Sequence, residues 1–344
     1  MEDGARKPAE GIARKGAGTV STQSTTNEAA LRPEVVTFGE TMGLLIGGAK
    51  GIEHSASLDK SFGGAESNVA IGLARLGHRV GWFGLLGDDP VGRHILKTIR
   101  GEGVDVSRAS LTDEAATGLM LREQLAGKSS VYYYRKLSAA SRMRPEELDA
   151  DYIGQAKLLH LTGITPALSP NCRDTAREAI RVAKAAGVKV VFDPNLRLKL
   201  WGLDEARTTL LELAEEADYF LPGLDELKLL YDTDDFEEIV DRLRRLKAQT
   251  IVKGGDRETY VIYPDEVVAV PYFKAEHFVD PIGAGDGFCA GFLSGLLRGF
   301  DPVEAVRLGN LVGSLVVQMA GDWEGLPTRA EADAVLNNKA HVER

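Results

Sequence analysis

The sequence predicts an α/β protein of three layers, with a mostly parallel central sheet between helices and a small β-sheet lid beside it. Three observations predict this fold. Short apolar segments alternate with amphipathic helical patterns, which is typical of a parallel sheet covered on both faces. Two alternating segments interrupt that pattern and give the lid. Of the 344 residues, 44% are hydrophobic, which is enough to bury a large core.

The elements follow one another from residue 35 onward. The expected strands of the main sheet are short and rich in Val, Ile and Phe, and they cover residues 35–39, 79–85, 157–161, 188–192, 219–221 and 250–253. The expected helices carry apolar residues at helical spacing on one face, and they cover residues 67–76, 91–100, 171–186, 205–217, 236–247 and 302–319. Gly77 and Gly187 end two of these helices.

The lid is expected from strands within about residues 44–61 and 115–137, which include a hairpin around residues 126–128. Successive side chains of a strand point to opposite faces, so Tyr133 and Arg135 share one face, and Tyr132 and Tyr134 share the other. One face of a lid must look into the cleft. Aromatic pairs that stabilise the hairpin are the alternative explanation of these tyrosines.

The two ends of the chain differ from the folded body at residues 34–330. Residues 1–33 hold almost no large apolar side chains, which predicts a disordered tail, and residues 331–344 are expected to be loosely ordered. The tail has no apolar h-region of a secretory signal, and no apolar run reaches the roughly 18 residues of a membrane span. The net charge of −10 argues against nucleic-acid and anionic-membrane partners. Two separate cysteines suit a reducing cytoplasm.

Residues 279–295 carry the most chemical information. Gly283, Ala284 and Gly285 open a helix, so their backbone N–H groups are uncovered and the helix dipole favours an anion such as phosphate. Asp286 follows at the rim of this anion hole. A bound phosphate repels a carboxylate, so a role as a helix cap explains Asp286 poorly. A role as the base that takes a proton from a hydroxyl explains it better.

Other polar residues follow strands, at the sheet edge where ligands bind in such folds. Arg197 comes shortly after the strand at 188–192 and can donate two parallel hydrogen bonds to a carboxylate; a surface ion pair is the alternative. Gly63 and Gly64 allow a ligand close to the backbone, or form a plain capping loop. Glu226 suits either a water-held Mg²⁺ or the helix dipole. Two explanations remain for Lys253: it faces the phosphates of a nucleotide, or it belongs to a simple turn after the strand.

From about Val35 to Pro327 the chain resembles the ribokinase (PfkB) family of carbohydrate kinases. Two signatures carry the resemblance, Gly63, Gly64 and Asn68 near the start and residues 280–286 near the end. Within that family the chain is most similar to the 2-keto-3-deoxygluconate kinases. The segments that support this are residues 133–136, 138–141, 160–169, 193–201 and 321–325.

The resemblance implies a ribokinase-like fold and ATP-dependent phosphorylation of 2-keto-3-deoxygluconate at its terminal C6 hydroxyl, as in Entner–Doudoroff catabolism. It implies ATP, Mg²⁺ and a monovalent cation such as K⁺ as cofactors. Asp286 would be the catalytic base beside the anion hole at 283–285. The sugar acid would be held by Gly64, Asn68, Tyr133, Arg135, Arg197 and Asp286. Lys253, Gly255 and Asn310 would lie along the ATP site, and Glu226 would hold the metal through water.

Three positions depart from the family pattern. Met120 stands where relatives often have a lid tyrosine, Gly223 replaces the Asn of the Asn-x-x-Glu metal motif, and Glu258 replaces a glycine of the nucleotide turn. A kinase for a neutral sugar such as fructose or ribose, and a non-catalytic sugar-acid sensor, remain alternatives. Gluconate-type and galactonate-type substrates both remain open. A lid with one exposed face often pairs with its twin, which predicts a homo-oligomer through the lid sheet.

Overall fold

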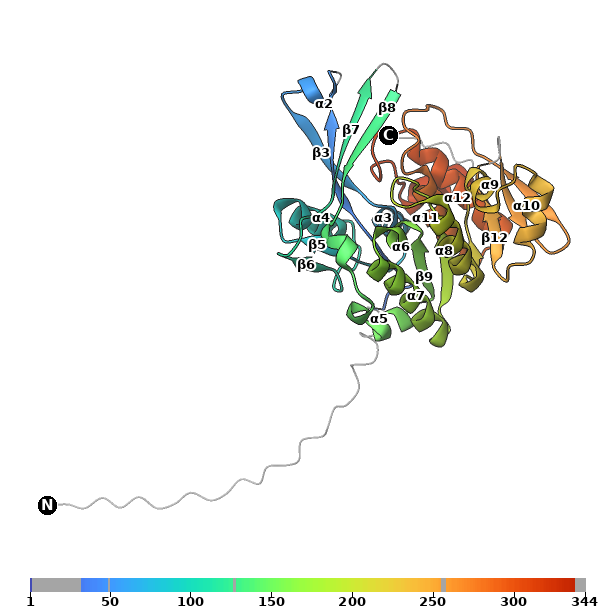
Figure 1. The fold of residues 1–344 in the computed structure, drawn as a ribbon, viewed down its shortest axis with the longest axis horizontal. Helices are drawn as coiled ribbons and strands as arrows, with labels where there is room; N and C mark the ends of the chain where they lie inside the picture. Colours follow the sequence, from blue (N-terminus) through green and yellow to red (C-terminus); the bar gives the residue numbers. More distant parts are fainter. Residues whose placement is uncertain (2–31, 49, 126–127, 255–257, 338–344) are drawn as a thin grey trace. The chain divides into compact units, whose positions relative to one another are not determined.

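An eight-stranded sheet forms the centre of the fold (Figure 1). The structure is a computed structural model, and it describes residues 1, 32–48, 50–125, 128–254 and 258–337. Across the sheet the strands follow the order β14 (Val267–Pro271), β13 (Glu258–Ile262), β12 (Gln249–Val252), β11 (Tyr219–Phe220), β10 (Lys189–Asp193), β9 (Leu158–Thr162), β1 (Val35–Phe38) and β4 (Val80–Phe83).

The strands from β12 to β4 are parallel, whereas β13 and β14 add an antiparallel edge. The sheet is therefore mostly parallel, as predicted. The carboxyl ends of its parallel strands lie at one edge, and this edge receives the loops that follow Phe38, Thr162, Asp193 and Val252.

Alternate residues of the central strands enter two separate cores. Val35 belongs to a core built with α3 (Ala65–Arg75), α4 (Pro90–Gly101), α11 (Ala284–Leu297) and α12 (Pro302–Val316). Val36 belongs to a second core built with α5 (Ala150–Gly154), α7 (Pro170–Ala185), α8 (Leu203–Glu216), α9 (Leu224–Tyr231) and α10 (Phe236–Leu243). Because neighbouring residues of a strand point to opposite faces, these two cores are the two faces of one sheet. The three-layer prediction is confirmed.

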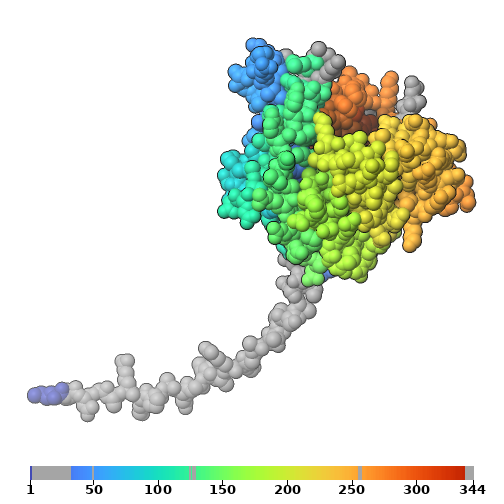
Figure 2. Space-filling view, in the orientation of Figure 1, coloured from blue at the N-terminus to red at the C-terminus, as the bar shows by residue number. Residues whose placement is uncertain are grey.

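The predicted small sheet is also confirmed. Its strands follow the order β3 (Leu58–Gly63), β2 (Met42–Gly47), β7 (Leu119–Leu125) and β8 (Lys128–Tyr134). This lid sheet projects, together with α2 (Gly51–His54), from one end of the domain, in blue and green at the top of Figures 1 and 2. Strand β2 pairs with β7 in parallel register and β7 pairs with β8 antiparallel, so two distant segments of the chain build one lid.

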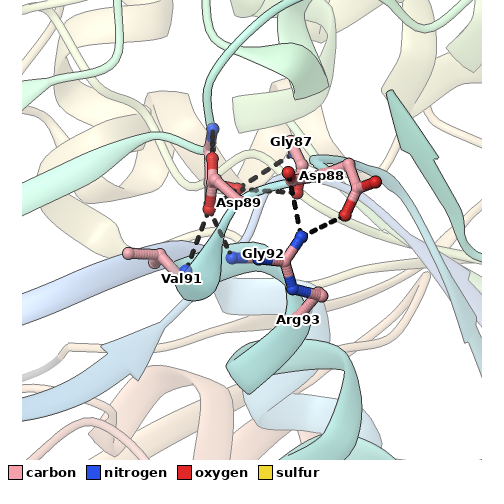
Figure 3. Close-up of polar contacts among 7 residues, drawn as sticks. Gly87, Asp88, Asp89, Val91, Gly92 and Arg93 are labelled. Atoms are coloured by element: carbon pink, nitrogen blue, oxygen red, sulfur yellow. Dashed lines mark hydrogen bonds and ion pairs between the residues drawn. The ribbon is translucent and has the colours of Figure 1, made fainter. Parts of the chain in front are cut away.

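The base of the lid is fixed to helix α4 by one carboxylate. Asp89 is the N-cap of α4 and accepts hydrogen bonds from the amides of Val91 (2.9 Å) and Gly92 (2.7 Å), as Figure 3 shows. The same side chain accepts from the amide of Thr117 (2.8 Å), two residues before β7. A capping residue thus also anchors the strand that enters the lid.

Several boundaries differ from those expected. The strand expected at 79–85 is split into β4 and β5 (Leu85–Gly87), and β5 pairs with β6 (Ser110–Thr112) in a separate two-stranded sheet. Two short helical turns at 139–142 and 145–147 and α6 (Ile164–Leu168) were not expected. Helix α13 (Arg329–Leu336) extends past residue 331, the expected start of the C-terminal tail, with Ala332 buried. Within the described ranges no helix is long and apolar enough to cross a membrane.

Candidate active site

A polar cavity of 430 Å³ lies between the lid sheet and the carboxyl ends of the central strands. Its wall contains side chains from the lid, from α3, from the loops after β1, β10 and β12, and from the start of α11. The predicted site residues in this wall are Gly64, Asn68, Tyr133, Arg135, Arg197, Glu226, Lys253, Gly283, Gly285 and Asp286. The fold thus brings together residues that are up to 222 positions apart, from Gly64 to Asp286.

The residues predicted to form the anion hole lie at the first turn of α11. Gly283 is its N-cap and has a φ of 78°, a left-handed conformation that favours glycine, and a Cβ there would lie 2.1 Å from the carbonyl oxygen of Asp322. Among the described residues, a Cβ on Gly285 would meet no atom within 4 Å outside its own helix backbone and chain neighbours. Protein packing therefore explains the glycine at 283 but not the one at 285. A glycine at 285 is consistent with the predicted approach of a ligand to the backbone.

Asp286 is oriented by a residue of helix α3. The Nδ2 of Asn68 donates a 2.8 Å hydrogen bond to Oδ2 of Asp286, and the amide of Gly64 donates to Oδ1 of Asn68 at 3.5 Å. Burial raises the pKa of Asp286 to about 6, although the hydrogen bond from Asn68 lowers it. A carboxylate with this pKa is ionised at neutral pH and still basic enough to accept a proton.

Lys253 lies at the back of the cavity. Its Nζ is 2.6 Å from Oδ2 of Asp193, and Cys289 Sγ donates to the same oxygen at 3.2 Å. Burial alone would lower the pKa of Lys253, but the adjacent Asp193 carboxylate raises it above its ordinary value, so the ammonium group stays charged. Residue 253 therefore supplies a fixed positive charge beside the anion hole.

The other basic residues of the wall differ in their partners. The guanidinium of Arg135 pairs with the buried carboxylate of Glu40, and that of Arg122 pairs with Asp280. Arg197 is exposed and donates a hydrogen bond to the carbonyl of Leu196 at 3.2 Å. Across the ranges that the structure describes, Arg197 has no acidic partner within ion-pair distance. Among the described residues, Arg197 is thus a cation of this wall that has no ion pair, although its charge lowers the pKa of Asp286.

Tyr133 lies on the cavity side of the lid. Lys199 Nζ lies 5.3 Å and the guanidinium carbon of Arg135 lies 5.7 Å from its ring centroid, so cations flank the ring. Tyr132 and Tyr134 are absent from the wall of the polar cavity and are 49% and 64% exposed. This division follows the alternation along the strand.

A second cavity of 350 Å³ adjoins the first, and Lys253 and Gly285 lie in the walls of both. Its wall is mainly apolar, with Phe273, Phe278 and Phe288. A flat aromatic ring such as a nucleobase suits such a surface.

The predicted nucleotide residues have different places around this second cavity. Ala284 and Asn310 line it, but the side chain of Asn310 is used by the protein. Its Oδ1 accepts from Thr259 Oγ1 at 2.7 Å, and its Nδ2 donates to two carbonyls of β14 at 3.1 Å. Gly313 lines the cavity, whereas Gly309 allows α12 to pack closely on Phe288. Gly255 lies outside the described residues.

Glu226 was predicted as a metal residue, and the structure gives it a second task. Its Oε1 accepts from the amide of Leu196 at 2.6 Å and its Oε2 from the amide of Gly223 at 2.7 Å. Burial raises the pKa of Glu226, and nearby Asp193 adds to the shift. Within the described part of the chain no group of three or more His, Cys, Asp or Glu side chains could hold a metal. The residues present fit a hydrated Mg²⁺ that is held largely by phosphates, not a protein cage.

Sequence reasoning missed several residues of the wall. Asp322 lines the polar cavity and is 8% exposed, and burial raises its pKa to about 7, with Asp286 adding to the shift. Glu40, Arg122 and Asp193 also line it. The similarity of residues 321–325 to relatives was a usable signal for Asp322. Glu40, Arg122 and Asp193 gave no such signal, because each is placed in the wall by pairing with a residue far away in the sequence.

Comparison with known proteins agrees with this geometry. Residues 32–329 match the pfkB family of carbohydrate kinases. The chain belongs to this family. A 2-dehydro-3-deoxygluconokinase of Bacillus subtilis (strain 168) is 40% identical over 320 residues, which cover 91% of this chain and 98% of that protein.

Other relatives extend the comparison of this pfkB-family chain. A 2-dehydro-3-deoxygluconokinase of Thermoproteus tenax is 35% identical and covers 83% of this chain and 88% of its own length. The crystal structure of a PfkB protein from Polaromonas sp. JS666 superposes with a TM-score of 0.80 at 38% identity, and covers 88% of this chain and 99% of that one. The resemblance seen in the motifs is confirmed. As a carbohydrate kinase, the chain has a polar cavity of a size for a small sugar next to an apolar cavity, and Gly285 of the predicted anion hole lies in the walls of both.

Proposed function

We propose that this pfkB-family kinase transfers the γ-phosphoryl group of ATP to the C6 hydroxyl of 2-keto-3-deoxygluconate, which gives 2-keto-3-deoxy-6-phosphogluconate. Arg197 carries the proposal, because it lines the polar cavity as a cation without an acidic partner among the described residues. A neutral sugar would leave this charge uncompensated, whereas a sugar acid supplies a carboxylate. The names of the relatives from Bacillus subtilis and Thermoproteus tenax support the same substrate.

The proposed roles follow from the positions of the residues. The sugar acid lies in the polar cavity against Gly64 and Tyr133, with Arg197 at its carboxylate and Asp322 within reach of its hydroxyls. The adenine ring enters the apolar cavity, and the γ-phosphate lies at the first turn of α11. Asp286 then accepts the proton of the attacking hydroxyl. Lys253, in the walls of both cavities, stabilises the charge on the transferred group.

Arg135 and Glu226 support the site indirectly in this proposal. Arg135 is paired with Glu40 and orients the lid beside Tyr133. Glu226 would hold Mg²⁺ through water while it fixes the loop before Arg197 through the amide of Leu196. Mg²⁺ neutralises charge on the phosphates when it is bound. Dependence on K⁺ is tested by replacing K⁺ with Na⁺ in the assay.

The experiment is a coupled ADP-release assay with 2-keto-3-deoxygluconate, its galactonate epimer, fructose and ribose. We expect a kcat/KM for one keto acid that exceeds those for fructose and ribose by at least about tenfold, because a lost charge-assisted hydrogen bond costs about 1.5–3 kcal/mol. Faster turnover of fructose or ribose would establish the neutral-sugar kinase instead. Binding of the keto acid without ATP turnover on any sugar would establish the sensor.

We also propose a homo-oligomer that forms through the lid sheet in the cytoplasm. Leu125, Tyr132 and Tyr134 of this sheet are exposed, which is unusual for large apolar and aromatic side chains unless a partner covers them. The two buried free cysteines suit a reducing compartment. Light scattering of the wild type and of Tyr134→Ser tests the oligomer, and a monomeric wild type would contradict it.

A further inference from the structure

A residue of the lid sheet is ion-paired to the loop that carries the anion hole. Arg122 lies on β7, and its guanidinium pairs with the carboxylate of Asp280, 158 positions later in the chain. The side chains of Arg122 and Asp280 are 8% and 3% exposed. A pair buried this deeply is costly to form and costly to break, because removal of either partner leaves a charge away from water.

The carboxylate of Asp280 fixes two loops at once. Its Oδ1 accepts a hydrogen bond from the amide of Ile282 at 3.2 Å, directly before Gly283. Its Oδ2 accepts from the amide of Gly321 at 3.3 Å, directly before Asp322. These two loops also touch, because the carbonyl of Asp322 lies where a Cβ on Gly283 would be. One side chain thus holds the start of the proposed anion hole and the wall of the polar cavity together.

Arg122 supplies the cation beside this buried carboxylate. Without it, a side chain that is 3% exposed would hold an unpaired charge away from water, which is costly. Arg122 is also part of the wall of the polar cavity and belongs to the lid through its register with Ile46 and Val131. The cation on which the anion hole depends is therefore supplied by the lid.

We propose that Arg122 is a positioning residue that acts through Asp280, so that the anion hole reaches its productive geometry when the lid sheet is seated against the kinase core. This inference rests on the proposed function of residues 283–285 as the seat of the transferred phosphate. It adds that phosphoryl transfer depends on a lid residue that need not touch either substrate. A displacement of about 1 Å at a reacting group costs on the order of 10²-fold in rate, so a small shift of this loop suffices.

The experiment compares Arg122→Met, Arg122→Lys and Asp280→Asn with the wild type by steady-state kinetics. The sugar is whichever one the wild type phosphorylates fastest, so an error in the proposed substrate does not affect the outcome. We expect Arg122→Met and Asp280→Asn each to lower kcat by about 10²-fold, with a much smaller change in KM for the sugar. Arg122→Lys keeps the charge and is expected to retain more activity than Arg122→Met.

Two further readouts separate positioning from general loss of structure. The double variant Arg122→Met with Asp280→Asn is expected to have a kcat no lower than that of the worse single variant. The reason is that both substitutions remove the same interaction. Guanidinium ion at a non-denaturing concentration is expected to restore part of kcat in Arg122→Met, whereas KCl at equal ionic strength is not. The matched control is Arg93→Met, which breaks the exposed pair with Asp88 seen in Figure 3 and is expected to leave the kinetics unchanged.

Two results would overturn the proposal. One is a fold-loss of kcat in the double variant that equals the product of the fold-losses in the two single variants, since the residues would then act independently. The other is a variant Arg122→Met that changes KM for the sugar and leaves kcat intact, since Arg122 would then be a plain substrate ligand. If Arg122→Met does not fold, Arg122→Lys and Asp280→Asn still decide between a loss in kcat and a loss in KM.

Discussion

Asn68 donates a 2.8 Å hydrogen bond to the carboxylate of Asp286, although the two residues are 218 positions apart in the chain. One lies in the first turn of α3 and the other in the first turn of α11. The amide of Gly64 holds Asn68 from the other side. The orientation of the proposed base is therefore set by the glycine-rich segment at the start of α3, which is distant in the sequence but adjacent in the fold.

Replacement of Asn68 by Ala should shift the pH dependence of the reaction. The hydrogen bond from Asn68 lowers the pKa of Asp286, so its loss should raise that pKa above about 6. Asp286 acts in its ionised form, so wild-type kcat/KM should fall as the pH drops below about 6, and in the variant the fall should begin at higher pH. Profiles of kcat/KM between about pH 5 and pH 9 measure the shift. An unchanged acidic limb would mean that Asp286 is not the titrating base.

Asp286→Asn should bind both substrates and lose most turnover. General-base catalysis contributes about 10²–10⁴-fold, so kcat should fall by that factor while the dissociation constants change little. Calorimetric titration with the sugar acid and with ATP serves as the binding control. Near-normal turnover would remove Asp286 from the mechanism.

The same substitution should make the protein more stable near neutral pH. The pKa of Asp286 is raised from 3.8 to about 6, so the native state binds a proton more tightly than the unfolded state. Ionisation therefore disfavours the native state fully above about pH 6, and this penalty disappears as the pH falls toward 3.8. Asp286→Asn removes the penalty. Thermal unfolding at several pH values should show the gain in Tm shrinking across this window, and a gain that is independent of pH would contradict the explanation.

Arg197→Ala should weaken binding of the sugar acid selectively. A hydrogen bond to a charged group is worth about 1.5–3 kcal/mol, so KM for the keto acid should rise by about 10- to 100-fold. KM for ATP should stay nearly constant, because Arg197 lies in the wall of the polar cavity and not in that of the apolar one. Arg197→Lys keeps the charge without the planar guanidinium fork, so its KM for the keto acid should lie between those of the wild type and Arg197→Ala. An equal rise in KM for both substrates would argue against the assigned role.

Lys253→Met should affect both stability and catalysis. It leaves the buried carboxylate of Asp193 without its cation, and breaking a buried pair costs about 3–5 kcal/mol. Urea unfolding measures this loss. The double variant with Asp193→Asn should recover part of the stability but none of kcat, since the positive charge near the phosphate remains absent. Recovery of activity in the double variant would show that Lys253 serves only to balance Asp193.

The sequence was sufficient where a function depends on contiguous residues. Residues 283–286 are consecutive, so the helix start that they form could be predicted directly from the sequence, while their roles as anion hole and base stay predictions. The lid hairpin at β7 and β8 was also predictable, because period-two alternation around a short turn is a local signal. The alternation placed Tyr133 on the cavity side for the same reason.

Pairing between distant side chains was not predictable from local patterns. Arg135 lines the polar cavity as predicted, but its ion pair with Glu40, from the loop after β1, could not be predicted. Nothing near Arg122 in the sequence indicates Asp280 as its partner. Strands β13 and β14, which form the antiparallel edge, were not among the expected strands. Short strands have weak local signals, so their pairing partners in the fold decide them.

Lys253 and Gly285 belong to the walls of both cavities, so with the proposed placement of sugar acid and nucleotide each ligand binds beside residues that also face the other. This shared wall predicts heterotropic linkage, in which binding of the nucleotide changes the affinity for the sugar. Thermodynamics requires such linkage to be reciprocal. If ATP tightens the hold on the sugar acid by some factor, the sugar acid tightens the hold on ATP by the same factor. The order in which the two ligands arrive then makes no difference to the stability of the ternary complex.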